Sequence, residues 1–255
     1  MRTLVTPGKE TDLIRLDIAD LPAGESLELT SADETLIVVL GGVLDVAIDG
    51  QSLGRAGQRA NVFEGPGDAV YAAPGSSVRL TGIGDRDGGG AGIAVATAPL
   101  ADAPAGRTRI IRPPDQRSAA IGDGNWARQV RTILGPEHDA GRLLIGETVN
   151  PPGNWSSYPP HKHDVHDPPN EVQLEEVYFF KLDPAAGFGV QLLYGADGEE
   201  AFVVREGDVV AIKAGYHPVV AAPGYSLYYL WVMAGQGREM IPRLDPRHAW
   251  VQQGR

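Results

Sequence analysis

The chain of 255 residues contains no cysteine, no long apolar run and few basic residues. The absence of cysteine excludes a disulfide scaffold, thiol catalysis and zinc–thiolate sites. No stretch approaches the ~18 consecutive apolar residues of a membrane span, and the opening residues MRTLVTP lack the apolar core of a signal peptide. With 22 basic against 33 acidic residues the net charge is −11, whereas nucleic-acid binding needs clustered Lys and Arg. These absences predict a soluble, cytoplasmic protein that binds neither membranes nor nucleic acid.

Glycine and proline are abundant, and they lie between short apolar runs instead of clustering in linkers. The chain has 33 glycines and 20 prolines, and 42% of its residues are hydrophobic, which is enough for a packed core. Helical periodicity is scarce, while β-branched and aromatic runs recur. Short apolar runs separated by turn residues are typical of strands joined by tight turns, so the sequence predicts an all-β protein.

The predicted strands fall into two groups separated by a proline-rich connection at 99–118. Gly67-Asp68 in the first half and Gly207-Asp208 in the second each divide two apolar runs, which indicates an internal duplication. The duplication predicts two small β-barrels or jelly rolls, one over residues 1–118 and one over 119–255. The predicted strands are 35–40, 43–48, 60–63, 69–72, 77–81 and 92–98, then 143–149, 176–182, 189–194, 201–205, 208–212, 217–221 and 226–233.

All six histidines lie in the second half, beginning at His138. A histidine-built site can therefore belong only to the second predicted barrel. The first barrel would lack metal and would supply packing, a lid or the contacts of a homo-oligomer.

His161 and His163 flank a single residue, so on a strand both imidazoles point to the same face. Single histidines are more often surface or core residues than ligands, and this pair alone is a weak signal. Glu176 at the head of an apolar strand and His217 after the Gly-Asp hairpin add a carboxylate and a third imidazole. The four residues predict one divalent metal ion, and zinc, manganese and iron all suit three nitrogens and one oxygen.

These spacings resemble the two split motifs of the cupin superfamily. Longer phrases, GNWSSYPPHKHD at 153–164, GYHPV at 215–219 and PGYSLYYLWVMAG at 223–235, resemble the 5-deoxy-glucuronate isomerase family of bacterial inositol catabolism. The resemblance covers nearly the whole chain. It implies a bicupin whose metal ligands are His161, His163, Glu176 and His217. It also implies an aldose–ketose isomerisation of a small sugar acid, 5-deoxy-D-glucuronate, to 2-deoxy-5-keto-D-gluconate.

Three residues near these ligands are the candidates for catalysis. Tyr178 follows Glu176 by two residues on the same strand face, although simple core packing would explain it equally well. Gln191 lies on the next strand, where it would bind sugar hydroxyls. Lys162 could move a proton, but it alternates away from the two histidines. The substrate carboxylate needs a cation, and the sequence offers Arg128, Arg142 and Arg205 without choosing among them.

Two other classes of protein share this ligand pattern. One is a mononuclear iron cupin dioxygenase, and the other is a non-catalytic, metal-stabilised sugar-binding bicupin. The long family phrases favour the isomerase over both. The family pattern leads us to expect a small polar residue at position 231, where this chain has a tryptophan. Trp231 is predicted to reshape one wall of the pocket.

Overall fold

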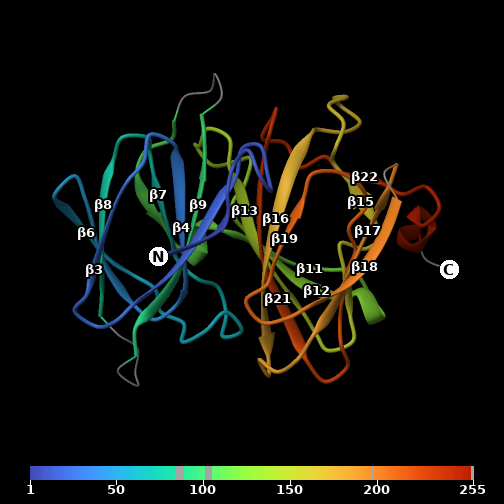
Figure 1. Cartoon of the computed structure of the whole chain (residues 1–255), viewed down its shortest axis with the longest axis horizontal. Coiled ribbons are helices and arrows are strands. Elements are labelled where there is room, and N and C mark those ends of the chain that lie inside the picture. The colour runs from blue at the N-terminus through green and yellow to red at the C-terminus, as the bar shows by residue number, and fades with distance from the viewer. Residues whose placement is uncertain (84–88, 101–104, 197, 254–255) are drawn as a thin grey trace. The chain divides into compact units, whose positions relative to one another are not determined.

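The computed structural model describes residues 1–83, 89–100, 105–196 and 198–253 (Figure 1). Strands dominate the described residues, which contain three short 3-10 helices and no α-helix: η1 (Pro113–Asp115), η2 (Gly124–Trp126) and η3 (Ala249–Gln253). The predicted all-β class is confirmed. Within the described ranges, no helix has the length and apolar character needed to cross a membrane.

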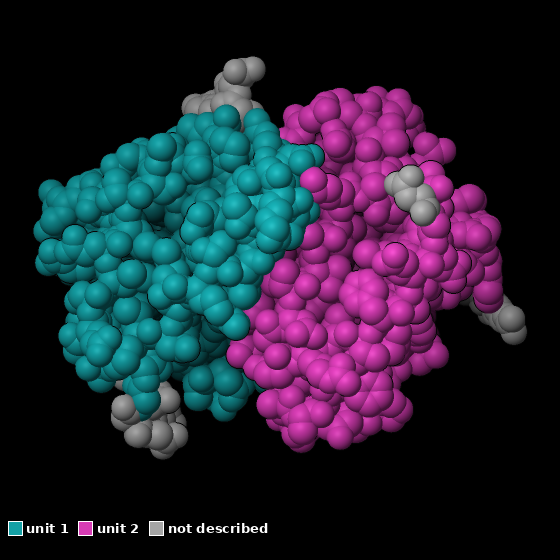
Figure 2. Space-filling model, viewed as in Figure 1, with its two compact units in different colours: residues 1–117, 133–144 teal, residues 118–132, 145–255 magenta. Residues whose placement is uncertain are grey.

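The chain divides into two compact units (Figure 2). Unit 1 comprises Met1–Arg117 and Ile133–Leu144, and unit 2 comprises Ser118–Thr132 and Ile145–Arg255. The expected boundary after residue 118 lies beside the first change of unit. The segment 133–144 belongs to unit 1, although the sequence placed it in the second half. Residues 101–104 of the expected connection lie outside the described residues.

Unit 1 is built on two antiparallel sheets. Its interior is apolar, since the inward-facing residues of both sheets, such as Ile37, Val46 and Leu80, are fully or almost fully buried. The six-stranded sheet has the order β1 (Arg2–Val5), β2 (Arg15–Leu21), β9 (Ala91–Ala98), β4 (Glu34–Gly41), β7 (Ala69–Ala72) and β10 (Arg109–Ile111), and the four-stranded sheet has the order β3 (Ser26–Thr30), β8 (Ser77–Gly82), β5 (Leu44–Ile48) and β6 (Gln51–Ala56).

Unit 2 also has a six-stranded and a four-stranded sheet, with a two-stranded ribbon in addition. The first has the order β11 (Arg117–Ile121), β12 (Arg128–Leu134), β13 (Leu144–Asn150), β21 (Ser226–Gly235), β16 (Leu174–Asp183) and β19 (Val209–Ile212). The second has the order β14 (Trp155–Ser156), β20 (Val219–Ala221), β17 (Gly189–Gly195) and β18 (Gly198–Val204), and the ribbon pairs β15 (His161–Lys162) with β22 (Arg243–Leu244).

The strand order repeats between the units. If the strands of each unit are numbered along the chain, leaving out β15, the order β2-β9-β4-β7 in unit 1 matches the order β13-β21-β16-β19 in unit 2. In the same way, β3-β8-β5-β6 matches β14-β20-β17-β18. The two Gly-Asp turns occupy matching places in this order. The Val39 N–H donates to the Asp68 carbonyl (3.0 Å), and the Phe180 N–H donates to the Asp208 carbonyl (2.9 Å).

This correspondence aligns the two units residue by residue along β4 and β16. Thr35 lies four residues before Val39, as Glu176 lies four residues before Phe180. Thr35 pairs with the last residue of β7, and Glu176 pairs with the last residue of β19. Unit 1 therefore carries a hydroxyl where unit 2 carries a carboxylate.

The predicted strand at 60–63 is wrong, because these residues form turns. The Asn61 side-chain oxygen accepts a hydrogen bond from the Phe63 N–H (2.9 Å), and the Asn61 carbonyl accepts one from the Glu64 N–H (3.2 Å). Asparagine stabilises turns by such local bonds, which replace the ladder bonds of a strand.

Glu34 at the start of β4 attaches the segment 133–144 to the rest of unit 1. Its carboxylate is fully buried and accepts hydrogen bonds from the Tyr71 hydroxyl (2.8 Å) and from the backbone N–H groups of Gly141 (2.5 Å), Arg142 (2.7 Å) and Leu143 (2.9 Å). A carboxylate with several fixed donors is stable without a cation, because each donor compensates part of its lost hydration.

The variant Glu34→Gln should therefore lower the free energy of unfolding by about 2–4 kcal/mol, since the amide presents an NH₂ group to donors that lose their acceptor. Urea unfolding followed by circular dichroism measures the change. Glu28→Gln is the matched control, because Glu28 pairs with Arg79 on the exposed surface and should change stability by less than about 1 kcal/mol. Equal losses in both variants would contradict the role of Glu34.

Candidate metal centre

Three imidazoles meet inside unit 2. His161 lies on β15, His163 follows that strand, and His217 lies in the loop before β20. Their ligand atoms are all within 4.8 Å of one another. The ring centroid of His217 lies 4.9 Å from that of His161 and 5.1 Å from that of His163. Segments more than 50 residues apart in sequence thus contribute to one cluster.

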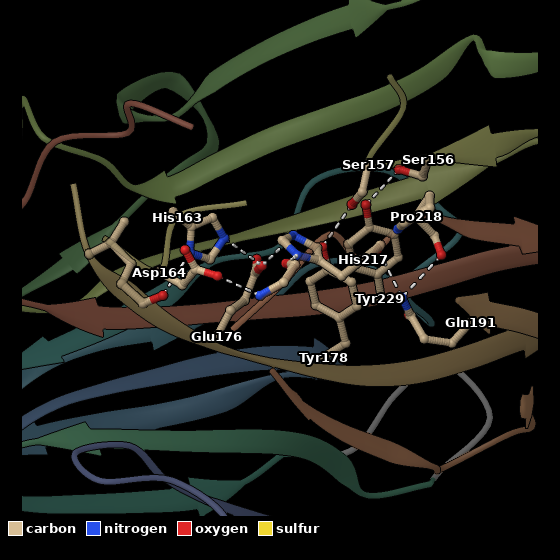
Figure 3. A network of polar contacts seen from close by, with 12 residues as sticks. Ser156, Ser157, His163, Asp164, Glu176, Tyr178, Gln191, His217, Pro218 and Tyr229 are labelled. Carbon is tan, nitrogen blue, oxygen red and sulfur yellow. Dashed lines mark hydrogen bonds and ion pairs between the residues drawn. The ribbon is translucent and has the colours of Figure 1, made fainter. Parts of the chain in front are cut away.

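The Glu176 carboxylate lies against this cluster (Figure 3). Its Oε2 atom is 3.2 Å from His163 Nε2 and 3.3 Å from His217 Nε2. Both His217 and Glu176 are buried. The structure therefore brings together all four residues that the sequence offered as ligands.

Backbone carbonyls orient two of the rings from the outside. His163 Nδ1 donates to the Leu174 carbonyl (2.6 Å), and His217 Nδ1 donates to the Gly215 carbonyl (3.0 Å). Each bond places a proton on Nδ1, so that the Nε2 lone pair of the neutral ring points toward the cluster. Histidine ligands in metalloproteins are commonly held by a second bond of this kind.

Burial and mutual charge set the protonation of the cluster. Burial, together with the neighbouring His217 and His163, lowers the pKa of His161 to about 3. Burial opposes ionisation of Glu176, but the imidazoles of His163 and His217 beside its carboxylate outweigh burial and lower the pKa of Glu176 to about 2. Burial also opposes charging of His163, and the hydrogen bond and charge of Glu176 nonetheless raise its pKa. Glu176 is thus a carboxylate at neutral pH, and it requires a positive charge beside it.

The donor set fits a divalent cation. His217 Nε2 is fully buried and makes no hydrogen bond, although Glu176 Oε2 is only 3.3 Å away. A buried nitrogen without a hydrogen bond is unfavourable unless another partner takes its lone pair. Imidazole nitrogens and one carboxylate oxygen are common ligands of zinc, manganese and iron, and a bound ion would also neutralise Glu176.

The cluster opens into a cavity of about 280 Å³. His161, His163 and Glu176 line one part of it, and apolar side chains such as Trp231 and Met233 line another. Trp231 therefore forms part of the wall. Sites for small molecules are typically mostly apolar, with a few polar groups that fix the orientation of the ligand.

Tyr178 also lines this cavity, and its hydroxyl lies within a chain of hydroxyl groups. Its OH lies 2.8 Å from Ser157 Oγ, and its ring lies 4.3 Å from that of Tyr229. The Tyr229 OH lies 2.5 Å from Ser156 Oγ. Burial and the nearby charge of Glu176 raise the pKa of Tyr178 well above its ordinary value, so the phenol keeps its proton at neutral pH.

Lys162 lies outside the cavity, on the opposite face of β15 from the histidine rings. Its Nζ atom pairs with Asp164 and with Glu171. Asp164 Oδ2 in turn accepts a hydrogen bond from the Gly215 N–H (2.8 Å). The pair Lys162–Asp164 therefore connects the segment of His161 and His163 to the loop that carries His217.

Gln191 is also outside the cavity, in the middle of the four-stranded sheet. Its Nε2 donates to the backbone carbonyls of His217 (2.8 Å) and Pro218 (3.1 Å). These bonds use both amide hydrogens, so they hold the His217 loop in place. The structure thus separates Tyr178, which lines the cavity, from Lys162 and Gln191, which support it.

Sequence reasoning missed two cavity residues, Ser157 and Tyr229. Tyr229, Trp231 and Met233 alternate along β21 and share one face, and this period of two was available in the sequence. Ser157 has φ = 50°, a left-handed conformation that is uncommon outside glycine and asparagine. Nothing in the local sequence signals that conformation.

Comparison with known proteins gives a consistent result. The model of the KduI/IolB family matches residues 1–251. The chain is 37% identical over 249 residues to a 5-deoxy-glucuronate isomerase of Geobacillus thermodenitrificans, covering 96% of this chain and 88% of the relative. It is 35% identical to the 5-deoxy-glucuronate isomerase of Bacillus subtilis strain 168, covering 97% and 91% of the two chains.

Solved structures show the same relationship at the level of the fold. An IolB-like protein of Salmonella typhimurium superposes with a TM-score of 0.89 at 30% identity, covering 98% of this chain and 94% of that one. The oxalate decarboxylase of Lactobacillus farciminis superposes with a TM-score of 0.62 at 14% identity, covering 90% and 79%. The second likeness concerns the fold alone.

Removing one imidazole should abolish most metal binding. We expect His163→Ala and His217→Ala to lose most of the bound divalent ion, because each leaves only two nitrogens beside Glu176. Elemental analysis of the purified variants measures the ion, and circular dichroism reports whether the β structure survives. His166→Ala is the matched control, since His166 is exposed in the loop that follows His163. Unchanged metal content in both cluster variants would show that the ion binds elsewhere.

Proposed function

Because the chain belongs to the KduI/IolB family, we propose that it is a metal-dependent aldose–ketose isomerase that converts 5-deoxy-D-glucuronate to 2-deoxy-5-keto-D-gluconate in inositol catabolism. The observation that carries this proposal is the cluster of three imidazoles and Glu176 at the cavity, in a chain whose relatives named 5-deoxy-glucuronate isomerase match it over nearly its full length. One divalent ion held by His161, His163, Glu176 and His217 is part of the proposal.

The proposal includes the architecture. Unit 1 would be an N-terminal cupin barrel and unit 2 a C-terminal one, which makes the protein a bicupin. The proposed domains, residues 1–118 and 119–255, correspond to these units except that 133–144 belongs to unit 1 and Ser118 to unit 2. The repeated strand order supports this division, and the apolar interior of unit 1 supports a first barrel without metal. The substrate would be a small sugar acid in the cytoplasm, and a homo-oligomer stays a prediction.

The reaction moves one proton between neighbouring carbons of the substrate. A proton leaves the carbon that bears the hydroxyl, and a proton is added to the former aldehyde carbon. The hydroxyl oxygen loses its own proton and becomes the ketone oxygen, while the former aldehyde oxygen gains a proton and becomes a hydroxyl. Negative charge collects on these two oxygens during the transfer. A divalent ion bound in the cluster would supply a Lewis acid for those oxygens. The chain's own residues must then orient the sugar, exclude water and hold the proton that is exchanged.

Tyr178 is the residue that we propose for holding a proton at the substrate. Tyr178 lines the cavity, and its hydroxyl shares a hydrogen bond of 2.8 Å with Ser157 Oγ. A proton passed between Tyr178 and Ser157 would stay inside the cavity wall. Positioned acid–base groups of this kind contribute about 10²–10⁴-fold to rates.

Lys162 and Gln191 are positioning residues in this proposal. Lys162 pairs with Asp164, whose carboxylate accepts a hydrogen bond from the Gly215 N–H. Gln191 donates a hydrogen bond to the carbonyl of His217. Both keep the His217 imidazole at the distance from Glu176 that the cluster needs. Neither has to contact the substrate.

Turnover of 5-deoxy-D-glucuronate by the purified protein tests the proposal directly. We expect conversion to 2-deoxy-5-keto-D-gluconate, detected by NMR, at the same rate with and without oxygen. The His217→Ala variant should lose most of this activity. A reaction that requires O₂ would identify the dioxygenase alternative, and ligand-induced stabilisation without turnover would identify a sugar-binding protein.

The Tyr178→Phe variant separates a catalytic role from core packing. We expect kcat to fall by about 10²-fold or more, because the phenyl ring keeps the packing but lacks the hydroxyl. The metal content should stay unchanged. Tyr225→Phe provides the comparison, since Tyr225 lies outside the cavity and packs on Gly187. A Tyr178→Phe enzyme with normal kcat would leave Tyr178 with a packing role only.

A further inference from the structure

The cavity beside the metal cluster contains one permanent positive charge. Among the described residues that line it, Arg128 at the start of β12 is the only lysine or arginine. We propose that the Arg128 guanidinium binds the carboxylate of the sugar acid. This inference rests on the proposed function, because it assumes a substrate that carries both a carboxylate and a carbonyl.

Arg128 has no carboxylate partner in the described part of the chain. Its hydrogen bonds both leave from Nη1, to the carbonyls of Trp126 and Tyr158 (3.1 Å each), and its Nε is buried without a hydrogen bond. Burial also lowers the pKa of this guanidinium. A half-buried cation without a counter-ion is unfavourable, so this charge is suited to an anionic ligand.

Arg131 on the same strand provides a contrast. Its Nη1 lies 3.1 Å from Oε1 of the fully buried Glu147, so its charge is neutralised within the protein. Of these two arginines on one strand, Arg131 has a carboxylate counter-ion, and Arg128 has none among the described residues. Only Arg128 combines an unpaired charge with a place in the cavity wall.

The guanidinium of Arg128 is held in place before any ligand binds. The Trp126 ring lies 5.9 Å from its Cζ atom. The Asn154 side-chain amide donates to the carbonyls of Gly124 (3.1 Å) and Ala127 (2.7 Å), which fixes the backbone just before Arg128. The bonds from Nη1 leave Nη2, which is not among the buried atoms without a partner, as the group that can donate to a carboxylate.

The site for the carboxylate is connected to the metal cluster by a short segment. Tyr158, whose carbonyl accepts a bond from Arg128, is separated from His161 only by Pro159 and Pro160. Tyr158, Pro159 and His161 all line the cavity. The cavity lining thus contains two separate polar groups, the metal cluster and Arg128, which suit a substrate with a carbonyl at one end and a carboxylate at the other.

The structure excludes the other arginines that the sequence offered. Arg142 lies in unit 1, where its backbone N–H bonds Glu34. Arg205 is exposed at the end of β18 and does not line the cavity. Neither is among the described residues that line the cavity beside the histidines.

The test compares an acid with its neutral amide. We would measure kcat/KM of the wild type, Arg128→Gln and Arg128→Lys on 5-deoxy-D-glucuronate and on its primary amide, 5-deoxy-D-glucuronamide. For the acid, we expect Arg128→Gln to lose about 100-fold, mostly through a higher KM, and Arg128→Lys to lose less. For the amide, kcat/KM should change by less than about 3-fold. Arg205→Gln is the control, and metal content and melting temperature check that each variant is intact.

The outcomes separate this inference from the proposed function. Equal losses for acid and amide, or no loss for the acid, would overturn the role of Arg128 while leaving the isomerase activity established. A wild-type protein that turns over neither compound would overturn the proposed function. In that case, the affinities of the protein for D-glucuronate and D-glucose, measured by calorimetry, would test whether Arg128 binds a carboxylate. Preference of the wild type for the acid, abolished by Arg128→Gln, would support it, and an unchanged preference would overturn it.

Discussion

The buried carboxylate of Glu176 is the constraint on which the arrangement of unit 2 depends. A carboxylate removed from water is strongly unfavourable unless positive or polar partners surround it, and Glu176 has two imidazole nitrogens within 3.3 Å. Those imidazoles are useful only if their orientation is fixed. The carbonyls of Leu174 and Gly215 fix it by hydrogen bonds. Much of the polar network of the unit can thus be derived from the cost of burying one charge.

Unit 1 buries a carboxylate as well, and the two carboxylates differ in the groups that compensate their charge. Glu34 is compensated by three backbone N–H groups and a phenol, which are fixed and cannot exchange for an ion. Glu176 is compensated by imidazoles, whose lone pairs are available to a metal. At the place of Glu176 unit 1 has Thr35. The same strand order therefore supports a purely structural carboxylate in one unit and a candidate metal ligand in the other.

The sequence could predict the strands and the cluster because both follow from the period of two in a strand. That period put His161 and His163 on one face, and it also indicated that Lys162 points away from them. It could not predict contacts between segments far apart in sequence. The sequence placed Gln191 correctly on the strand after β16, yet its amide donates to the carbonyl of His217, and this depends on how β17 meets the His217 loop. The turn at 60–63 was missed because the side-chain hydrogen bond of Asn61 competes with an apolar pattern.

Arg128 shows a different limit of sequence reasoning. Whether an arginine is functional depends on what its charge meets. Arg128 and Arg131 lie three residues apart on one strand and point to opposite faces, and the sequence does not show which face meets the cavity. Glu147 neutralises one of them, while backbone carbonyls hold the other. Besides Arg128 and the imidazoles, the cavity wall contains the apolar side chains of Trp231 and Met233. An apolar wall offers no hydrogen bond to a hydroxyl, so under the proposed function it suits the deoxy carbon of the substrate. Such a wall discriminates against an added hydroxyl by only about 10²-fold, so recognition must depend mainly on the two polar ends.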